Sequence, residues 1–429
     1  MYKRQKVRLE RLGYFKEVNV ETIPVPGTED QIDIVYSVEE ETTGSVGGNI
    51  GYSDFGLMLG FNLQEQNFLG SGNTVGIGIN KNIYSEMYNI SYMNPYATRD
   101  AVSLGYNVFF RETDYGEFNV ANYLTNSNGF GAQFGYPISD ISRLGFNITY
   151  DKTDIDIGTL PAREIYDFVS VEGNIFETLT AQLSWQQVTL NRGLFPTDGA
   201  STVVSFSSTI PGSDLSYYRF NIRQRYYQPL SSDFVFGFQG EIGYLDSYGD
   251  TEEIPFFQNF YAGGPRSLRG FESNTLGPRS TDAPCYEFNY EDGTCPNLLD
   301  TDGDGEADAP YLNPYANQGQ RSRYRDAPIG GNIKVEGSLQ LIFRLPFIED
   351  QRSLRSAFFF DFGNVFSDNC KEYQINCSEL SVDELRYSYG VGITWITGFG
   401  PMSLAIAKPT NAGPLERTEE FQFTVGNVF

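Results

Sequence analysis

The residues with the clearest capacity for metal chemistry lie in one acidic segment of the chain. Read from Asp300, the segment DTDGDGEAD places carboxylates at positions 1, 3, 5 and 9 and glycine at position 6, as in a calcium loop of the EF-hand kind. Position 12 is Tyr311 instead of a bidentate glutamate, so a solvated acidic loop is the alternative. The segment therefore predicts at most a weak calcium site, with the ligands Asp300, Asp302, Asp304 and Asp308.

The four cysteines form two close pairs, each inside a polar segment rich in turn residues. Cys285 lies near Cys295, and Cys370 lies near Cys377. This spacing is typical of disulfides formed in an oxidising compartment. No CxxC occurs, which disfavours a structural zinc or a thioredoxin-like site. We expect each disulfide to order an outside loop and to stabilise the fold by about 2 to 3 kcal/mol.

The chain lacks the usual groups of hydrolytic enzymes and of nucleic-acid-binding proteins. It contains no histidine, the commonest general base and transition-metal ligand, and no GxSxG nucleophile motif. Its formal net charge is −25, from 30 Lys and Arg against 55 Asp and Glu, so no phosphate-binding surface for nucleic acid is expected. We therefore expect a protein that is not an enzyme and that requires no cofactor.

Apolar and polar residues alternate through most of the chain. Every second residue is apolar from Val102 to Phe110, and the pattern recurs from Leu144 to Tyr150 and from Phe421 to Val425. With 34 Phe, 29 Tyr and 45 Gly, the composition favours short strands and a wide apolar surface. No run of 18 apolar residues exists, so a membrane-spanning helix is not expected. The fold is predicted to be all-β.

The length of the alternating region favours a membrane barrel over a soluble sandwich. The region runs from residue 43 to 429 without a second linker, whereas a soluble all-β domain rarely exceeds about 250 residues. Sixteen antiparallel strands fit, joined by short turns on one side and long loops on the other. The longest loop covers 246–331. The predicted strands lie near 45–53, 57–66, 73–82, 86–94, 101–112, 127–136, 142–152, 178–188, 200–209, 216–227, 233–245, 332–344, 355–366, 385–396, 401–408 and 419–429.

Several short motifs, taken in order, resemble those of a known family. They are Asn67-Phe68-Leu69-Gly70-Ser71-Gly72, Phe195-Pro196-Thr197-Asp198-Gly199, Thr209-Ile210-Pro211-Gly212-Ser213, Phe260-Tyr261-Ala262-Gly263-Gly264, Leu268-Arg269-Gly270-Phe271, Asp361-Phe362-Gly363 and the ending Gln422–Phe429. At these strand boundaries the chain resembles the BamA family, the barrel subunits that insert β-barrel proteins into the bacterial outer membrane. The resemblance implies an integral outer-membrane protein. Its implied partners are unfolded client proteins, accessory assembly lipoproteins and outer-membrane lipids.

The resemblance also implies that loop 246–331 folds toward the lumen and is held there through Leu268, Arg269, Gly270 and Phe271. Alternation places Asp361 on the face opposite its phenylalanine neighbours, so its carboxylate points inward and can bind the guanidinium of Arg269. A solvated loop cation is the alternative. A wall glutamate faces this arginine in the family. The matching position here is Gln340, and Glu336 on the same face could substitute for it.

A weak seam between the first and last strands is the third feature that the resemblance implies. Glycine lowers strand propensity in the first strand, and Gly426 would let the last strand bend inward. The alternative is that these glycines relieve crowding at barrel corners. A terminal aromatic such as Phe429 is common in outer-membrane barrels and does not discriminate. The seam is predicted to comprise Val46, Gly47, Gly48, Asn49, Ile50, Gly426, Asn427, Val428 and Phe429.

Residues 1–42 differ from the rest and suggest a small α+β unit. Helical periodicity near the start is followed by two short alternating runs around residues 18–22 and 32–36. The resemblance identifies this stretch as the C-terminal part of the last periplasmic POTRA module, with earlier modules receiving the lipoproteins. A passive porin would carry no such module. TamA-like and two-partner secretion transporters share the module and the Arg-Gly-Phe loop, so they remain the closest alternatives.

Overall fold

The structure, a computed structural model, describes most of the chain. The described residues are 15–27, 31–54, 56–98, 100–116, 120–158, 161–281, 289, 327–345, 348, 353–374, 376–398 and 400–426. The acidic segment that begins at Asp300, the pair Cys285 and Cys295, and the final residues Asn427, Val428 and Phe429 lie outside these ranges. Predictions that concern them therefore stay predictions.

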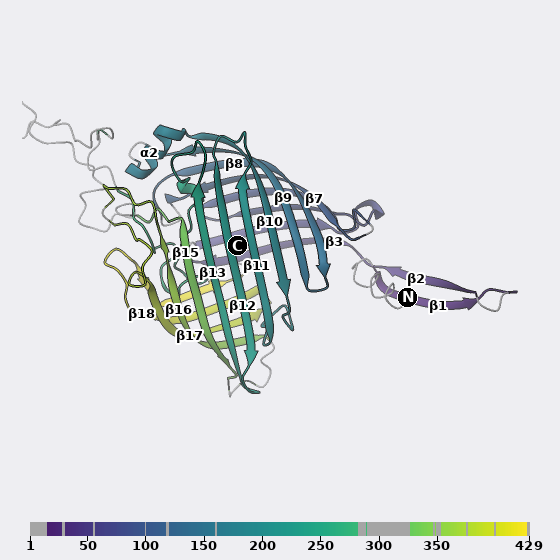
Figure 1. Cartoon of the computed structure of the whole chain (residues 1–429). Coiled ribbons are helices and arrows are strands. Elements are labelled where there is room, and N and C mark those ends of the chain that lie inside the picture. The colour runs from purple at the N-terminus through teal and green to yellow at the C-terminus, as the bar shows by residue number, and fades with distance from the viewer. Residues whose placement is uncertain are drawn as a thin grey trace, which may run out of the picture.

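The strands that follow residue 43 close into one antiparallel barrel of sixteen strands (Figure 1). Each strand pairs with its sequence neighbours, and the last strand returns to the first. The strands are β3 Gly44–Ser53, β4 Gly56–Glu65, β5 Thr74–Lys81, β6 Ser85–Asn94, β7 Ser103–Asp114, β8 Leu124–Ser139, β9 Ser142–Asp156, β10 Ile175–Val188, β11 Gly199–Thr209, β12 Tyr217–Pro229, β13 Phe234–Ser247, β15 Ile333–Phe343, β16 Leu354–Phe366, β17 Arg386–Thr397, β18 Gly400–Pro409 and β20 Phe421–Val425. The prediction of an all-β barrel with sixteen strands is confirmed.

The observed strand ends differ from the predicted ones by at most four residues. Three elements and two 3-10 turns were not predicted. The helix α2, Arg163–Glu172, lies in the connection between β9 and β10. Glu419, expected at the start of the last strand, lies instead in the short strand β19, Thr418–Glu419, which pairs with β14, Gly270–Phe271, in the long loop. Two 3-10 turns, η1 Phe68–Gly70 and η3 Phe256–Gln258, complete the described elements.

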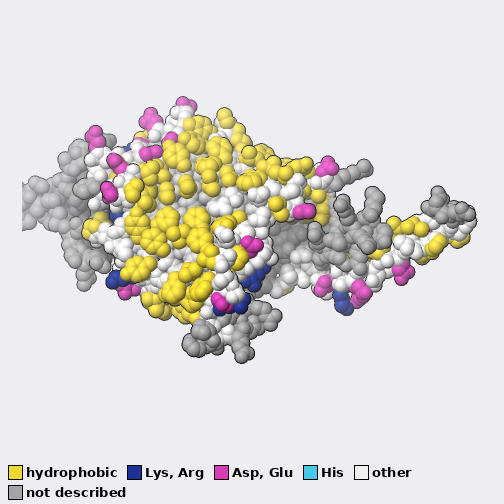
Figure 2. All heavy atoms as spheres, turned by 60° about the horizontal axis from the view of Figure 1, so that its bottom comes forward, with side chains coloured by type: hydrophobic (Ala, Val, Ile, Leu, Met, Phe, Trp, Pro, Cys, Tyr) yellow, Lys and Arg dark blue, Asp and Glu magenta, His cyan; other side chains and the backbone are white. Residues whose placement is uncertain are grey.

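The barrel wall presents apolar side chains outward and polar side chains inward. Along β16, Phe358 and Phe360 are exposed, whereas Phe359 and Asp361 between and beside them are buried. Figure 2 shows hydrophobic side chains gathered over a broad area of the wall, with charged side chains at its margins. A closed ladder gives hydrogen-bond partners to backbone groups, which lipid cannot provide. The outward apolar side chains suit contact with the hydrocarbon of the bilayer.

Residues 15–40 form a separate hairpin, apart from the barrel ladder. β1, Phe15–Pro24, pairs antiparallel with β2, Ile32–Glu40. These strands cover the two alternating runs predicted there. The assignment of residues 1–42 to a POTRA module stays a prediction.

The largest apolar core lies at the loop-bearing end of the barrel. It joins the ends of several strands to the long loop and to α2, through buried residues that include Tyr123, Ile155, Ile165, Phe168, Phe176, Leu215, Leu245, Phe256, Phe260, Leu268, Phe271 and Val365. Phe168 of α2 packs edge-on against Phe256 of the loop, with ring centroids 5.3 Å apart. α2 buries Ile165 and Phe168 and ends at Gly173, whose φ is 95°. Within the described ranges no helix is long and apolar enough to cross a membrane.

Candidate functional site

The long loop is anchored to the inner wall through Arg269. Its Nε donates to Asp361 Oδ2 at 2.7 Å, and its Nη2 donates to Asp361 Oδ1 at 2.7 Å. The Arg269 backbone N–H reaches the same carboxylate at 3.2 Å, and Nη2 also donates to Ser338 Oγ at 3.0 Å. Such a bidentate, charge-assisted pair fixes both position and orientation. The guanidinium carbon lies 3.4 Å from the centre of the Phe359 ring, which adds a cation–π contact.

The residues flanking Arg269 explain why the loop reaches this depth. Leu268 and Phe271 are buried at 1% and 0% exposure, so the loop has apolar anchors on both sides of its charged group. Gly270 has φ of 89°, and a side chain there would press against Ala407 and Pro409 of β18. The turn therefore requires glycine at this position. The structure thus brings Leu268, Arg269, Gly270 and Phe271 to the inner wall.

Gln340 and Glu336 do not bind Arg269 directly. Gln340 Nε2 donates to Ser338 Oγ at 3.2 Å, so it contacts the arginine only through that serine. Glu336 accepts a hydrogen bond from Ser267 and pairs with Lys334 at 3.2 Å. The idea that Glu336 could take over as a second carboxylate for the guanidinium is wrong in this geometry. Instead, Glu336 binds the loop at Ser267, two residues before Arg269.

The junction between the first and last strands is the weakest in the barrel. Within the described residues β20 pairs with β3 at one position, Val425 with Tyr52, whereas β3 pairs with β4 from Gly44 to Ser53. Gly426 follows with φ of 80°, and a side chain there would collide with the Ile50 carbonyl oxygen. Most of the edge of β3 therefore faces no described strand partner.

The predicted first-strand residues all lie along this edge. Val46 and Ile50 project outward with 71% and 65% of their surface exposed, and Gly47 and Gly48 are exposed as well. Asn49 points inward, and its side-chain nitrogen is buried without a hydrogen-bond partner. An exposed strand edge with little side-chain bulk is accessible to another strand.

The long loop also contacts both strands of the seam, which the sequence analysis missed. Gln422 of β20 is buried on the lumen face; its Nε2 donates to the Phe271 carbonyl at 2.8 Å, and its Oε1 accepts from the Gly270 N–H at 3.3 Å. On the other side, Ser273 donates a hydrogen bond to Asp54, which directly follows β3. Alternation along β20 indicates that Gln422 faces inward. Nothing in the sequence indicates its partner.

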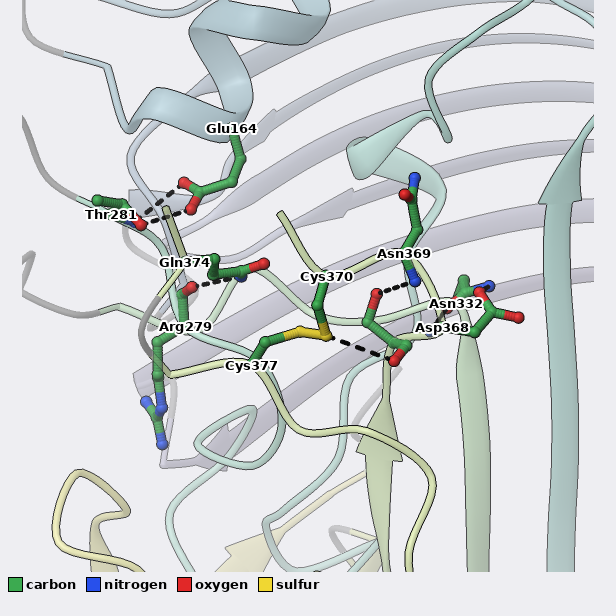
Figure 3. Close-up of a disulfide and its surroundings, with 10 residues drawn as sticks. Glu164, Arg279, Thr281, Asn332, Asp368, Asn369, Cys370, Gln374 and Cys377 are labelled. Atoms are coloured by element: carbon green, nitrogen blue, oxygen red, sulfur yellow. Dashed lines mark hydrogen bonds between the residues drawn. A yellow bond between two sulfur atoms is a disulfide. The ribbon is translucent and has the colours of Figure 1, made fainter. Parts of the chain in front are cut away.

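A disulfide-closed loop covers the outer end of the barrel. Cys370 and Cys377 are bonded, as predicted (Figure 3). The loop binds three other outer segments. Lys371 pairs with Glu253 at 2.5 Å, Tyr373 donates to Asp167 of α2 at 2.5 Å, and Gln374 donates to the Arg279 carbonyl at 2.7 Å.

The carboxylate of Glu164 fastens α2 to the long loop. Its oxygens accept from the Thr281 N–H at 2.9 Å and from the Thr281 hydroxyl at 2.7 Å, as Figure 3 shows. Burial raises the pKa of Glu164, although both hydrogen bonds from Thr281 oppose the shift. The Glu164 carboxyl therefore binds a proton more readily when α2 contacts the long loop than when the carboxyl is in water.

A family profile described as the Omp85 superfamily domain matches residues 67–429. The chain belongs to the Omp85 superfamily. The match begins after β3 and β4 and covers the other fourteen strands of the barrel, the long loop and the β20 side of the seam.

Two relatives are similar to this Omp85 chain over its full length. The outer membrane protein assembly factor BamA of Neisseria meningitidis serogroup B is 29% identical, over 99% of this chain and 52% of the relative. The crystal structure of BamA from Haemophilus ducreyi lacking POTRA domains 1–3 superposes with a TM-score of 0.81 at 29% identity, over 100% of this chain and 78% of that one. CdiB from Escherichia coli shares the fold at a TM-score of 0.55 and 10% identity, over 99% of this chain and 70% of that one.

The chain spans about half the length of the curated BamA relatives that match it from end to end. The similarity to BamA and the closed barrel identify it as an integral protein of the bacterial outer membrane. The more distant likeness to CdiB concerns the fold alone.

Replacing Asp361 by asparagine is expected to release the loop. The substitution keeps the shape but leaves the guanidinium of Arg269, 16% exposed, without its counter-charge, at a cost of about 3 kcal/mol. Urea unfolding of the barrel in detergent, followed by gel mobility of unheated samples, measures this loss. The control is Asp233→Asn, because the Asp233–Arg344 pair is exposed at 61% and 68%. Equal losses in both variants would contradict an anchoring role for Asp361.

Replacing Glu164 by glutamine is expected to remove the pH dependence of the contact between α2 and the long loop. Glu164 binds its proton more tightly when α2 contacts the long loop. The stability of this contact therefore falls as the pH rises from the ordinary carboxyl pKa, near 4.5, toward the raised pKa of Glu164. Glutamine can accept from the Thr281 N–H and donate to its hydroxyl at every pH. Hydrogen exchange of residues 163–172, corrected for intrinsic rates, should therefore quicken with pH in the parent and not in Glu164→Gln. Glu172→Gln, on the same helix, should behave like the parent.

Proposed function

We propose that this chain promotes the folding and insertion of β-barrel proteins into the bacterial outer membrane through the seam between β3 and β20. The observation that carries the proposal is that, among the described residues, these two strands of the closed barrel pair at one position, Val425 with Tyr52. The similarity to assembly factors named BamA supports the same function. The proposed partners are unfolded outer-membrane proteins, outer-membrane lipids and, through POTRA modules, assembly lipoproteins.

The free edge of β3 provides the hydrogen-bonding groups that a client strand needs. In hydrocarbon each unpaired backbone N–H or C=O costs several kcal/mol, so a client cannot enter strand by strand alone. Pairing of its terminal strand with β3 supplies those partners by β-augmentation, and later strands then add as hairpins. Gly47 and Gly48 leave the edge unobstructed by side chains.

The lipid beside the seam contributes a second effect. Within the part of the chain that the structure describes, β20 has five residues, whereas its neighbour β18 has ten. A wall with a short strand presents a reduced apolar height, and bilayers thin next to such a mismatch at a cost of fractions of a kcal/mol per Å. Thinner, less ordered lipid lowers the barrier to insertion. No covalent step is needed, so the proposed activity is not that of a classical enzyme.

A disulfide across the seam is expected to abolish the strand-pairing part of the activity. Tyr52→Cys with Val425→Cys joins paired, lipid-facing positions of β3 and β20. The rate at which an unfolded outer-membrane protein becomes heat-modifiable in liposomes should rise with the parent and fall with the locked chain to the acceleration that membrane thinning alone provides. Ile77→Cys with Ile90→Cys is the control, because it joins paired, exposed positions of β5 and β6 inside a continuous ladder. Equal acceleration by the locked chain would leave membrane thinning as the mechanism, and no acceleration with steady ion conductance would indicate a pore.

A cysteine at Gly48 is expected to cross-link to the last strand of a client during folding. Gly48 lies on the exposed part of β3 and pairs with no described residue of β20. A cysteine at Gly78, which is paired on both sides by β4 and β6, provides the control. Cross-links should form at Gly48 while insertion proceeds and be absent at Gly78. Their absence at both positions under active folding conditions would argue against strand pairing at the seam.

A further inference from the structure

The last strand has too few strand contacts to hold its place by the ladder alone. Among the described residues, β20 pairs with β18 at five positions, Phe421 to Val425, and with β3 at one. By comparison, β17 pairs with β18 from Ser388 to Thr397. In a membrane, a strand with so small a ladder needs another partner.

The long loop supplies that partner on the lumen face. β14 pairs with β19 immediately before the last strand, Gly270 opposite Glu419 and Phe271 opposite Thr418. Three residues further on, the amide of Gln422 binds the N–H of Gly270 at 3.3 Å and the carbonyl of Phe271 at 2.8 Å. Its donor and its acceptor thus imitate a strand neighbour, and only 2% of the residue is exposed.

The loop is itself fixed to a part of the wall remote from the seam. Arg269, next to Gly270, is bound by Asp361 of β16, which is separated from β20 by the two strands β17 and β18 in the barrel order. The loop therefore ties the Gln422 end of β20 to β16, in addition to its contact with Asp54 after β3. In contrast, the Gly426 N–H at the other end of the strand donates to the Pro401 carbonyl of β18 at 2.8 Å, and no described residue of the loop binds this end.

We propose that Gln422 is a positioning residue that holds the outer part of the last strand to the lumen loop, so that the seam opens without releasing β20 from the barrel. The proposal rests on the proposed function for its biological meaning. In this arrangement β3 and the terminal end of β20 separate, while Phe421 and Gln422 stay in place. Insertion can then proceed next to a strand edge of constant position.

Hydrogen exchange of residues 418–426 in lipid nanodiscs tests the positioning role. Gln422→Leu fills the same space but leaves the Gly270 N–H and the Phe271 carbonyl buried without partners. Exchange of this segment should then quicken about tenfold, since such a loss shifts a local opening equilibrium by roughly that factor. Residues 354–366 of β16 should exchange at the parent rate. Thr424→Val is the matched control, because Thr424 lies on the same face of β20 and contributes no hydrogen bond to the loop within the described residues.

Three outcomes would overturn the proposal: unchanged exchange in Gln422→Leu, equal acceleration in Thr424→Val, or acceleration that extends to β16. Gln422→Glu keeps the size and the acceptor but cannot donate to the Phe271 carbonyl, so it should also quicken exchange. The liposome folding rate is measured on the same variants. If the seam-locked chain accelerates folding as well as the parent does, strand pairing at the seam fails as the mechanism, yet the exchange of residues 418–426 still decides whether Gln422 positions the strand.

Discussion

The requirement that every backbone group in lipid have a partner dominates this structure. Fifteen of the sixteen strand junctions meet it with continuous ladders, and the junction of β20 with β3 meets it at one paired position among the described residues. A barrel with such a gap would be expected to lose its last strand. The gap is tolerated because the long loop enters the lumen and binds that strand from the inside.

The Arg269–Asp361 pair makes this arrangement possible. A loop that joins β13 to β15 is free to leave the lumen unless something fixes it, and a buried bidentate ion pair is both strong and directional. Leu268 and Phe271 bury apolar surface beside it, and Gly270 allows the backbone to approach β18. The loop then contacts the two strands of the seam through Gln422 and Asp54. The anchor on β16 thereby supports the junction of β20 with β3.

Much of the barrel could be predicted from the sequence, because alternation records which face of each strand meets lipid. The inward direction of Asp361 followed from its phenylalanine neighbours, and a glycine-rich first strand indicated weak pairing. The helix α2 was missed although Ile165 and Phe168 stand at helical spacing, because a segment of ten residues forms a stable helix only when that face packs, here against Phe256 and Phe257 of the distant long loop. The partner of Gln422 was equally inaccessible. It depends on the fold of a loop that is 151 residues away in sequence, and local periodicity contains no information on such a contact.

The apolar core lies at one end of the barrel and makes that end difficult to open. Aromatic and aliphatic side chains pack at the outer end, where α2, the long loop and the disulfide-closed loop are joined by Glu164, Tyr373 and Gln374. Opening that end would expose this core to water and break several hydrogen bonds at once. Parting β3 from β20 disrupts far less. The energetically cheapest opening therefore leads sideways into the bilayer, which is where a folding β-barrel has to go.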